Sequence, residues 1–225
     1  MQTLSITQEY YLCAVNSRWK TPGMQSTNVQ ACLLVSGTLE LLNEGYLRRD
    51  EQGNLRTARE WDDRLPYLKP LYEATIGMKK PRDLKGVAGH LLMAFNQKPF
   101  NEYFTGLGVS LVEVGDAEML SKKGFFRESM RCVPKPEAIK RIVRRIRAEL
   151  LEGGTITEES ICLVAFLDKS NLLRDYFSKF EAKDLKARLK EIKTQEPYSA
   201  IKKVIDDIEA LYAAFITVLL LLLAH

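Results

Sequence analysis

The most strongly hydrophobic stretch of the sequence lies at the C-terminal end of the chain. It covers residues 211–224 and contains no charged side chain. Just before it, hydrophobic residues recur at helical spacing from Ile201 to Leu211, and Pro197 is suited to the first turn of a helix. The pattern predicts a helix that begins amphipathic and becomes apolar on all sides, so that protein or lipid must cover it.

The length of this run favours burial in protein over a membrane span. Fourteen residues extend about 21 Å at a rise of about 1.5 Å per residue, whereas the hydrocarbon core of a bilayer is about 30 Å thick. A longer span would bring Glu209, Asp207 and Asp206 into lipid, where carboxylates are costly. We therefore interpret the run as a helix buried within a helical domain, with a C-terminal tail anchor as the alternative.

Hydrophobic residues at helical spacing also predict helices along most of the chain. Ser5 and Gln8 form a capping box at the start of the first helix. Residues 29–43 are almost uncharged and mix Ala31, Ser36 and Gly37 with large side chains, which suits a helix packed closely on several sides. Further helical patterns cover residues 61–72, 84–95, 139–150, 160–167, 172–180 and 185–192, and residues 107–114 form a further apolar segment.

Two segments break this periodicity and predict β-hairpins. Residues 46–57 contain a turn signal at 50–54, and residues 119–133 contain a Lys-Lys-Gly turn followed by Phe125 and Phe126. No internal repeat or long linker separates the elements. The sequence therefore predicts a single all-α domain over residues 1–225, in which amphipathic helices surround the buried apolar C-terminal helix and one or two small hairpins are attached.

Composition and charge place the chain among ordinary globular proteins. Hydrophobic residues make up 46% and charged residues 28%, and the net charge of +4 allows an anionic partner without demanding one. The N-terminus lacks the basic and apolar regions of a signal peptide. The cysteines are scattered and form no Cys-x-x-Cys pair, which predicts buried, reduced thiols in a cytoplasm. They are Cys13, Cys32, Cys132 and Cys162.

Catalytic chemistry is poorly represented. The sequence contains no phosphate-binding loop, dinucleotide-binding glycine motif, zinc-protease motif or nucleophile elbow. His90 lies among small and apolar residues, where a hydrogen-bonded core histidine is the simpler interpretation. Cys132 beside Arg131 is a weak candidate for an activated thiol. We expect no enzyme, no cofactor and no metal site.

The second predicted hairpin is the first candidate binding feature. Adjacent phenylalanines on a strand point to opposite faces, so Phe125 and Phe126 are both buried only if both faces are covered. Either the domain itself covers them, or another subunit or a lipid surface covers one side. Phe125, Phe126 and Met130 are therefore candidates for self-association or membrane contact.

The second candidate is the basic helix that follows the hairpin. Residues 135–147 hold six basic residues and one acidic residue. A solvated helix face is the simpler explanation for this charge. However, apolar insertion beside cationic attraction suits a peripheral membrane protein. Lys140, Arg141, Arg144 and Arg145 are the candidate contacts for an anionic lipid surface.

Several segments together resemble a known family. Residues 4–12 read Leu-Ser-Ile-Thr-Gln-Glu-Tyr-Tyr-Leu, residues 32–42 are followed by Gly45-Tyr46-Leu47, and residues 111–115 read Leu-Val-Glu-Val-Gly ahead of the Phe125–Phe126 pair. These segments resemble the Golgi phosphoprotein 3 family, in its shorter bacterial form. The resemblance implies a mostly helical fold with a buried apolar helix and a hairpin used in self-association and membrane contact.

Eukaryotic members of that family bind phosphatidylinositol 4-phosphate and the cytosolic tails of Golgi glycosyltransferases. Their headgroup pocket uses a tryptophan and three arginines. The corresponding positions here hold Gln25, Leu34, Asn101 and Phe104. None of these side chains offers the cationic fork that recognises a phosphate. The resemblance therefore implies the fold but not a retained phosphatidylinositol 4-phosphate site.

Two functions follow from these features. We expect a non-enzymatic peripheral membrane or adaptor protein that self-associates through residues 119–133 and sits in the cytoplasm, or at the inner face of the cell membrane. The alternative is a winged-helix-like, nucleic-acid-binding regulator with its wing near residues 45–54. Its recognition helix, at residues 29–44, would contain no lysine or arginine, so we expect no nucleic-acid partner.

Overall fold

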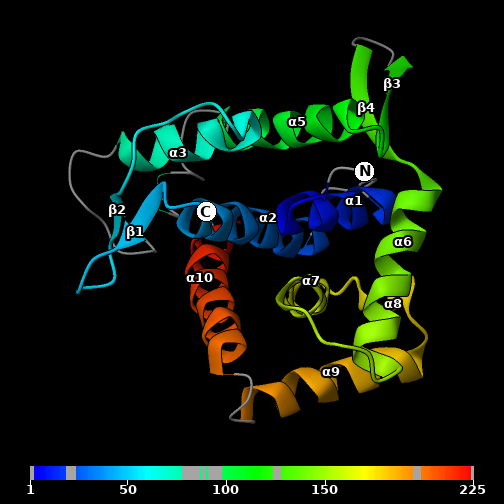
Figure 1. Cartoon of the computed structure of the whole chain (residues 1–225). Helices are drawn as coiled ribbons and strands as arrows, with labels where there is room; N and C mark the ends of the chain where they lie inside the picture. The colour runs from blue at the N-terminus through cyan, green and yellow to red at the C-terminus, as the bar shows by residue number, and fades with distance from the viewer. Residues whose placement is uncertain are drawn as a thin grey trace.

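The computed structural model describes residues 3–18, 24–77, 87, 90, 98–123, 128–194 and 199–223 of the chain. Within them it is mostly helical, as predicted (Figure 1). The helices are α1 (Ile6–Arg18), α2 (Met24–Asn43), α3 (Lys69–Ile76), α5 (Lys98–Glu113), α6 (Pro136–Ile146), α7 (Glu158–Lys169), α8 (Leu173–Tyr176), α9 (Lys179–Thr194) and α10 (Ser199–Leu223), with a 3-10 turn η1 (Pro66–Leu68) and a π-helical turn η3 (Arg147–Leu151). The strands are β1 (Leu47–Arg49), β2 (Leu55–Thr57), β3 (Ala117–Lys123) and β4 (Glu128–Pro134).

Local sequence signals set the start of the first helix. The Ser5 N–H donates to Gln8 Oε1 at 3.1 Å, and the Gln8 N–H donates to Ser5 Oγ at 3.2 Å. These reciprocal bonds satisfy backbone donors that the first turn of a helix leaves unpaired. The predicted capping box is confirmed.

Helix α7 occupies the centre of the molecule. Figure 1 shows it end-on, framed by α1 and α2 above, α10 on the left, α9 below and α6 on the right. Every residue from Ser160 to Leu167 is buried. Thr157 caps the helix by accepting the Ser160 N–H at 3.3 Å. An eight-residue stretch buried on all sides is the expected result for a helix that neighbouring helices cover all round.

Helix α10 lies at the edge of this frame. One of its faces packs on α2, α7 and α9. The buried residues on that face are Ile205, Ile208, Leu211, Ala214, Phe215 and Leu219. The opposite face is open: Ala210, Ala213 and Thr217 are exposed, and Leu221 is 59% exposed. The C-terminal helix is therefore buried along one face and is not surrounded, which corrects that part of the prediction.

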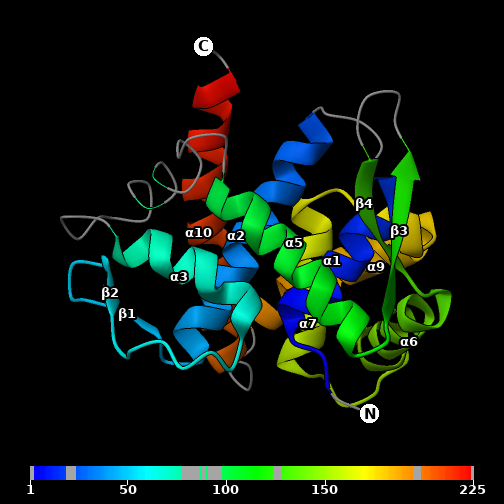
Figure 2. The same cartoon turned by 90° about the horizontal axis from the view of Figure 1, so that it is seen from above.

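Two features of α10 explain why only one of its faces is buried. Ala210, Ala213 and Thr217 leave little apolar surface in water along the middle of the open face, so one-sided packing suffices there, and Leu220 and Leu221 are exposed only in the last turn. In Figure 2 the last turns of α10 extend past the body of the molecule, beyond the reach of α7 and α9. Among the residues that the structure describes, none of the helices combines the length and the apolar character needed to cross a bilayer.

Helix α2 packs closely on several sides, as its small residues predicted. A Cβ atom on Gly37 would lie 2.6 Å from Leu71 Cδ1 and 2.6 Å from the Tyr103 hydroxyl oxygen, so only glycine fits there. That hydroxyl donates to the Leu33 carbonyl at 2.8 Å. All residues from Ala31 to Thr38 are buried. A helix so deeply placed cannot enter a DNA groove, which removes the structural basis of the winged-helix alternative.

Both predicted hairpins are present. Strands β1 and β2 pair antiparallel, with Leu47 opposite Thr57, and β3 and β4 pair with Ala117 opposite Pro134. The tip of the second hairpin, which includes Phe125 and Phe126, lies outside the described residues. The predictions for those two side chains therefore stay open. In Figure 2 this hairpin and the C-terminal end of α10 extend from the same edge of the molecule.

Candidate functional site

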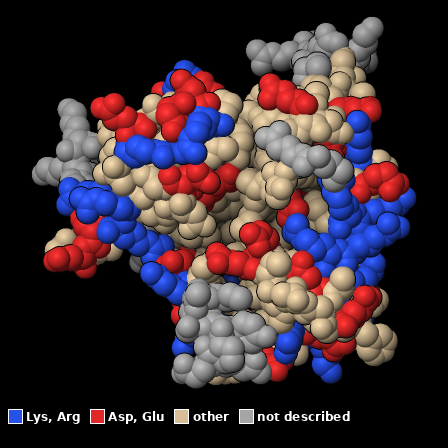
Figure 3. Space-filling view, viewed as in Figure 1, with Lys and Arg blue, Asp and Glu red and all other residues tan. Residues whose placement is uncertain are grey.

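The basic helix α6 is amphipathic and follows the second hairpin directly. Lys135 is its extended N-cap residue, and Pro136 fixes the first helical position. Its buried face consists of Ala138, Ile139, Ile142, Val143 and Ile146. This packing turns the intervening cations outward. Lysine and arginine side chains gather over α6 on the right of Figure 3.

The four predicted lipid contacts on α6 have different surroundings. Lys140 is exposed and pairs with Glu137 at 2.7 Å, one turn earlier on the same helix. Arg141 is exposed and pairs with Asp116 at 2.8 Å. Arg144 is exposed and has no ion-pair partner within the described part of the chain. Exposed pairs of this kind contribute little and exchange readily with other anions. These three cations therefore form an accessible face, which we call the α6 face.

Arg145 is directed into the protein instead. Its guanidinium donates to Glu9 Oε1 at 2.7 Å and also to the second carboxylate oxygen of Glu9, and it donates to Ser160 Oγ at 3.2 Å. The Glu9 side chain is 9% exposed and the Arg145 side chain 33% exposed. Burial raises the pKa of Glu9 and outweighs the opposing effect of Arg145. Arg145 thus joins α6 to α1 and α7, and it is not part of the α6 face.

The base of the hairpin is continuous with the α6 face. The Lys135 N–H donates to the Asp116 carbonyl at 2.9 Å, which closes the hairpin where α6 begins. Ala117 and Cys132 are buried at this base, whereas Leu120 on β3 is 51% exposed. Met130 lies opposite Ser121 in the strand pairing, and its side chain lies outside the described residues. The structure therefore places an exposed apolar residue on the hairpin and three accessible cations on the helix that follows it.

The positions of the family lipid pocket lack a cationic site. Leu34 is fully buried in α2, and Phe104 on α5 packs against the Tyr11 ring, with the two ring centroids 4.8 Å apart. Asn101 lines a cavity of about 690 Å³ beside α5, and the side chain of Gln25 lies outside the described residues. The charged residues that line this cavity are Lys98, Glu102 and Glu113. Its two carboxylates outnumber its one cation, which opposes binding of an anionic headgroup.

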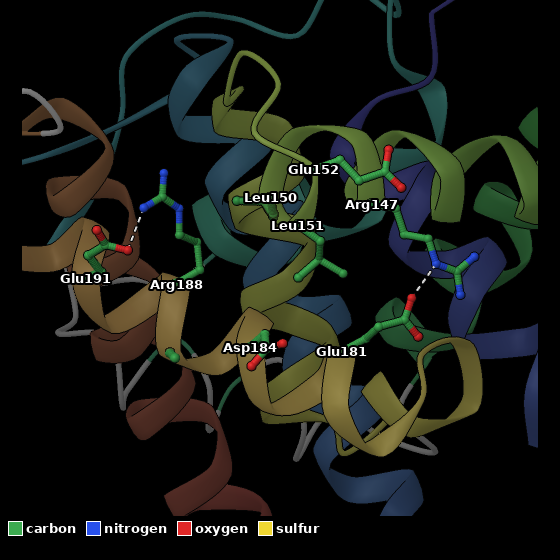
Figure 4. Close-up of a pocket in the computed structure, with 9 residues that line it drawn as sticks. Arg147, Leu150, Leu151, Glu152, Glu181, Asp184, Arg188 and Glu191 are labelled. Carbon is green, nitrogen blue, oxygen red and sulfur yellow. Dashed lines mark hydrogen bonds and ion pairs between the residues drawn. The ribbon is translucent and has the colours of Figure 1, made fainter.

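A second cavity, of about 570 Å³, lies between η3 and α9 (Figure 4). Arg147 pairs with Glu181 at 2.7 Å, and Arg188 pairs with Glu191 at 2.5 Å. Glu152 and Asp184 add two more carboxylates to the lining. The arginines are thus already neutralised, and the cavity has an excess of negative charge.

The four cysteines and His90 all lie among the described residues. All four cysteines are buried and free, as predicted, and burial raises the pKa of the Cys132 thiol, so that it is not an activated nucleophile. His90 is half-buried. Within the residues described here, no group of histidine, cysteine and carboxylate side chains is arranged to hold a metal ion.

A family model described as Golgi phosphoprotein 3 (GPP34) matches residues 6–208, which is most of the chain. No curated protein gives a significant match.

Proposed function

Since the chain belongs to the Golgi phosphoprotein 3 family, we propose that it is a non-enzymatic peripheral membrane protein that attaches to anionic lipid through the α6 face. The observation that carries this proposal is the outward display of Lys140, Arg141 and Arg144 on α6, which begins directly after the hairpin that carries the exposed Leu120. Each cation near an anionic bilayer surface contributes about 1 kcal/mol of attraction. An exposed apolar side chain on the adjoining hairpin can enter the headgroup region.

The hairpin supplies the second part of the proposal. Residues 119–133 associate with the same hairpin of another copy or enter the membrane, and Phe125, Phe126 and Met130 are the contacts. The adaptor role rests on this self-association, which would display several α6 faces on one assembly. The protein then works in the cytoplasm, at the inner face of the cell membrane. Charge density, and not one phosphoinositide, selects the surface, because the family pocket positions carry no cationic fork.

Vesicle co-sedimentation tests the membrane part. The variant K140Q/R141Q/R144Q removes three exposed cations and leaves the buried face of α6 intact. We expect its affinity for vesicles of phosphatidylcholine and phosphatidylglycerol to fall about a hundredfold at low salt, because three contributions of about 1 kcal/mol are lost. Binding of the unmodified protein should weaken as salt rises, since salt screens exposed charges.

The control variant is K190Q/K202Q/K203Q, which removes the same charge from exposed positions on α9 and α10. It should bind anionic vesicles as the unmodified protein does. Equal losses in the two variants would show that only net charge matters and would refute a specific α6 face. Failure of the unmodified protein to pellet with anionic vesicles at low salt would remove the membrane function altogether.

A further inference from the structure

A third cavity, of about 630 Å³, lies where α8 and the C-terminal end of α7 meet α9. Leu173 and Ala182 are its buried apolar lining. Its charged and aromatic lining residues are Asp168, Arg174, Lys179, Phe180, Lys183 and Lys186. It is formed by elements other than α6 and the hairpin, so it is distinct from the α6 face.

The charge of this cavity sets it apart from the other two. Four cations line it against the single carboxylate of Asp168, whereas carboxylates predominate in the cavities beside α5 and η3. Asp168 is already paired with Lys186 at 2.6 Å. In the part of the chain that the structure describes, Arg174, Lys179 and Lys183 have no carboxylate within ion-pair distance. Three cations around one hollow therefore lack a neutralising group.

An exposed aromatic ring stands at the same place. Phe180 is 79% exposed, more than any other large hydrophobic side chain in the described residues. On α9, Lys179 directly precedes Phe180, and Lys183 follows it one helical turn later. Phe177, three residues earlier, is buried, whereas the Phe180 ring lies outside the core. A ring left in water beside unpaired cations suits a ligand that is both anionic and apolar.

We propose that this cavity binds a phosphate group carried by a ligand whose apolar part packs against Phe180. Phosphate fits better than a carboxylate because it carries up to two charges and three acceptor oxygens for the surrounding cations. Arg174 supplies planar paired donors, and the lysines supply compact point charges. The ligand is either a soluble phosphate ester or a phospholipid headgroup, since both present the same group. This inference goes beyond the α6 proposal and stands without it.

Titration with inorganic phosphate and phenyl phosphate, followed by NMR of the backbone amides, tests the soluble source. We expect shifts concentrated at residues 168–186, with tighter binding of phenyl phosphate because an aromatic pair contributes about 0.5–1.5 kcal/mol, or roughly twofold to tenfold in affinity. The variant K179Q/K183Q should weaken both probes about tenfold, as expected for the loss of two exposed ion pairs. The variant F180S should remove only the advantage of phenyl phosphate.

The matched control is K190Q/K202Q, which loses the same charge away from the cavity and should bind both probes unchanged. All four substituted lysines and Phe180 are exposed, so the variants should keep the thermal midpoint of the unmodified protein. Absence of shifts at residues 168–186, or shifts that K179Q/K183Q leaves unchanged, would overturn the phosphate site. An advantage of phenyl phosphate that persists in F180S would overturn the role of Phe180.

Vesicles of phosphatidylcholine with phosphatidic acid test the lipid source, in the K140Q/R141Q/R144Q background that removes the α6 face. Adding K179Q/K183Q or F180S should then lower the remaining pelleting if the ligand is a lipid headgroup. Unchanged pelleting together with specific phosphate binding would support the soluble ester. The two proposals can thus fail separately, because the probe titration does not depend on membrane attachment.

Discussion

Replacing Phe215 by alanine should lower the free energy of unfolding by about 3–5 kcal/mol, as is typical when a buried phenyl ring is removed. Phe215 is fully buried on the face of α10 that packs on the body of the protein. The truncation leaves a cavity that close-packed neighbours fill only in part. Urea denaturation followed by far-UV circular dichroism measures this change directly.

Leu221 on the same helix provides the control. It is 59% exposed, so Leu221→Ala should change the free energy of unfolding by no more than about 0.5 kcal/mol. This contrast tests one-sided packing of α10. Equal destabilisation by both substitutions would mean that the open face is covered as well. Little effect from Phe215→Ala would mean that α10 does not belong to the core.

Arg145→Ala should destabilise the protein by about 3 kcal/mol at neutral pH. The substitution leaves the Glu9 carboxylate buried without its bidentate partner, and breaking such a pair from one side is strongly destabilising. Chemical denaturation measures the free energy of unfolding of Arg145→Ala and of the control variant Arg144→Ala. Arg144 is exposed and has no ion pair in the described residues, so its loss should cost less than about 0.5 kcal/mol.

The pH dependence of the Arg145→Ala effect has a definite sign. Burial already raises the pKa of Glu9 above 4.5 in the folded state, and loss of Arg145 raises it further. A carboxyl whose folded pKa is raised binds its proton more tightly when folded, so its stabilising effect is present at low pH and is lost as pH rises. The cost of Arg145→Ala should therefore shrink as the pH falls toward 4.5. A cost that does not vary with pH would show that Glu9 is not the group left unpaired.

Local sequence patterns predicted the helices and strands of this fold well. They did not predict how deeply each helix is buried. The capping box at Ser5, the hairpin turns and the close packing at Gly37 follow from short-range rules that need no tertiary information. Helices α7 and α10 both contain long apolar runs. Because the run of α10 is longer, the sequence favoured α10 as the helix buried at the centre of the domain. The structure places the shorter helix there because α1, α2, α6, α9 and α10 all pack around α7. The number of neighbours around a helix is a tertiary property that periodicity does not contain.

The same limit applies to the candidate site. The sequence identified the basic helix, and its hydrophobic spacing correctly placed Ile139, Ile142, Val143 and Ile146 on the inner face. It could not separate Arg145 from Arg144, because Glu9 lies in a helix 136 residues away in the chain. The sequence also did not identify the cavity where α7, α8 and α9 meet. Its cations come from two helices, and the only local signal was Phe180 among lysines on a predicted helix.

Hydrogen–deuterium exchange with and without vesicles of phosphatidylcholine and phosphatidylglycerol directly tests whether the protein attaches to anionic membrane through the α6 face. Added anionic vesicles should slow exchange in α6 and in the β3–β4 hairpin, residues 117–146, while neutral vesicles should not. The open face of α10 should exchange at the same rate in both conditions. Slowed exchange confined to α10, or no change in residues 117–146, would contradict attachment through the α6 face.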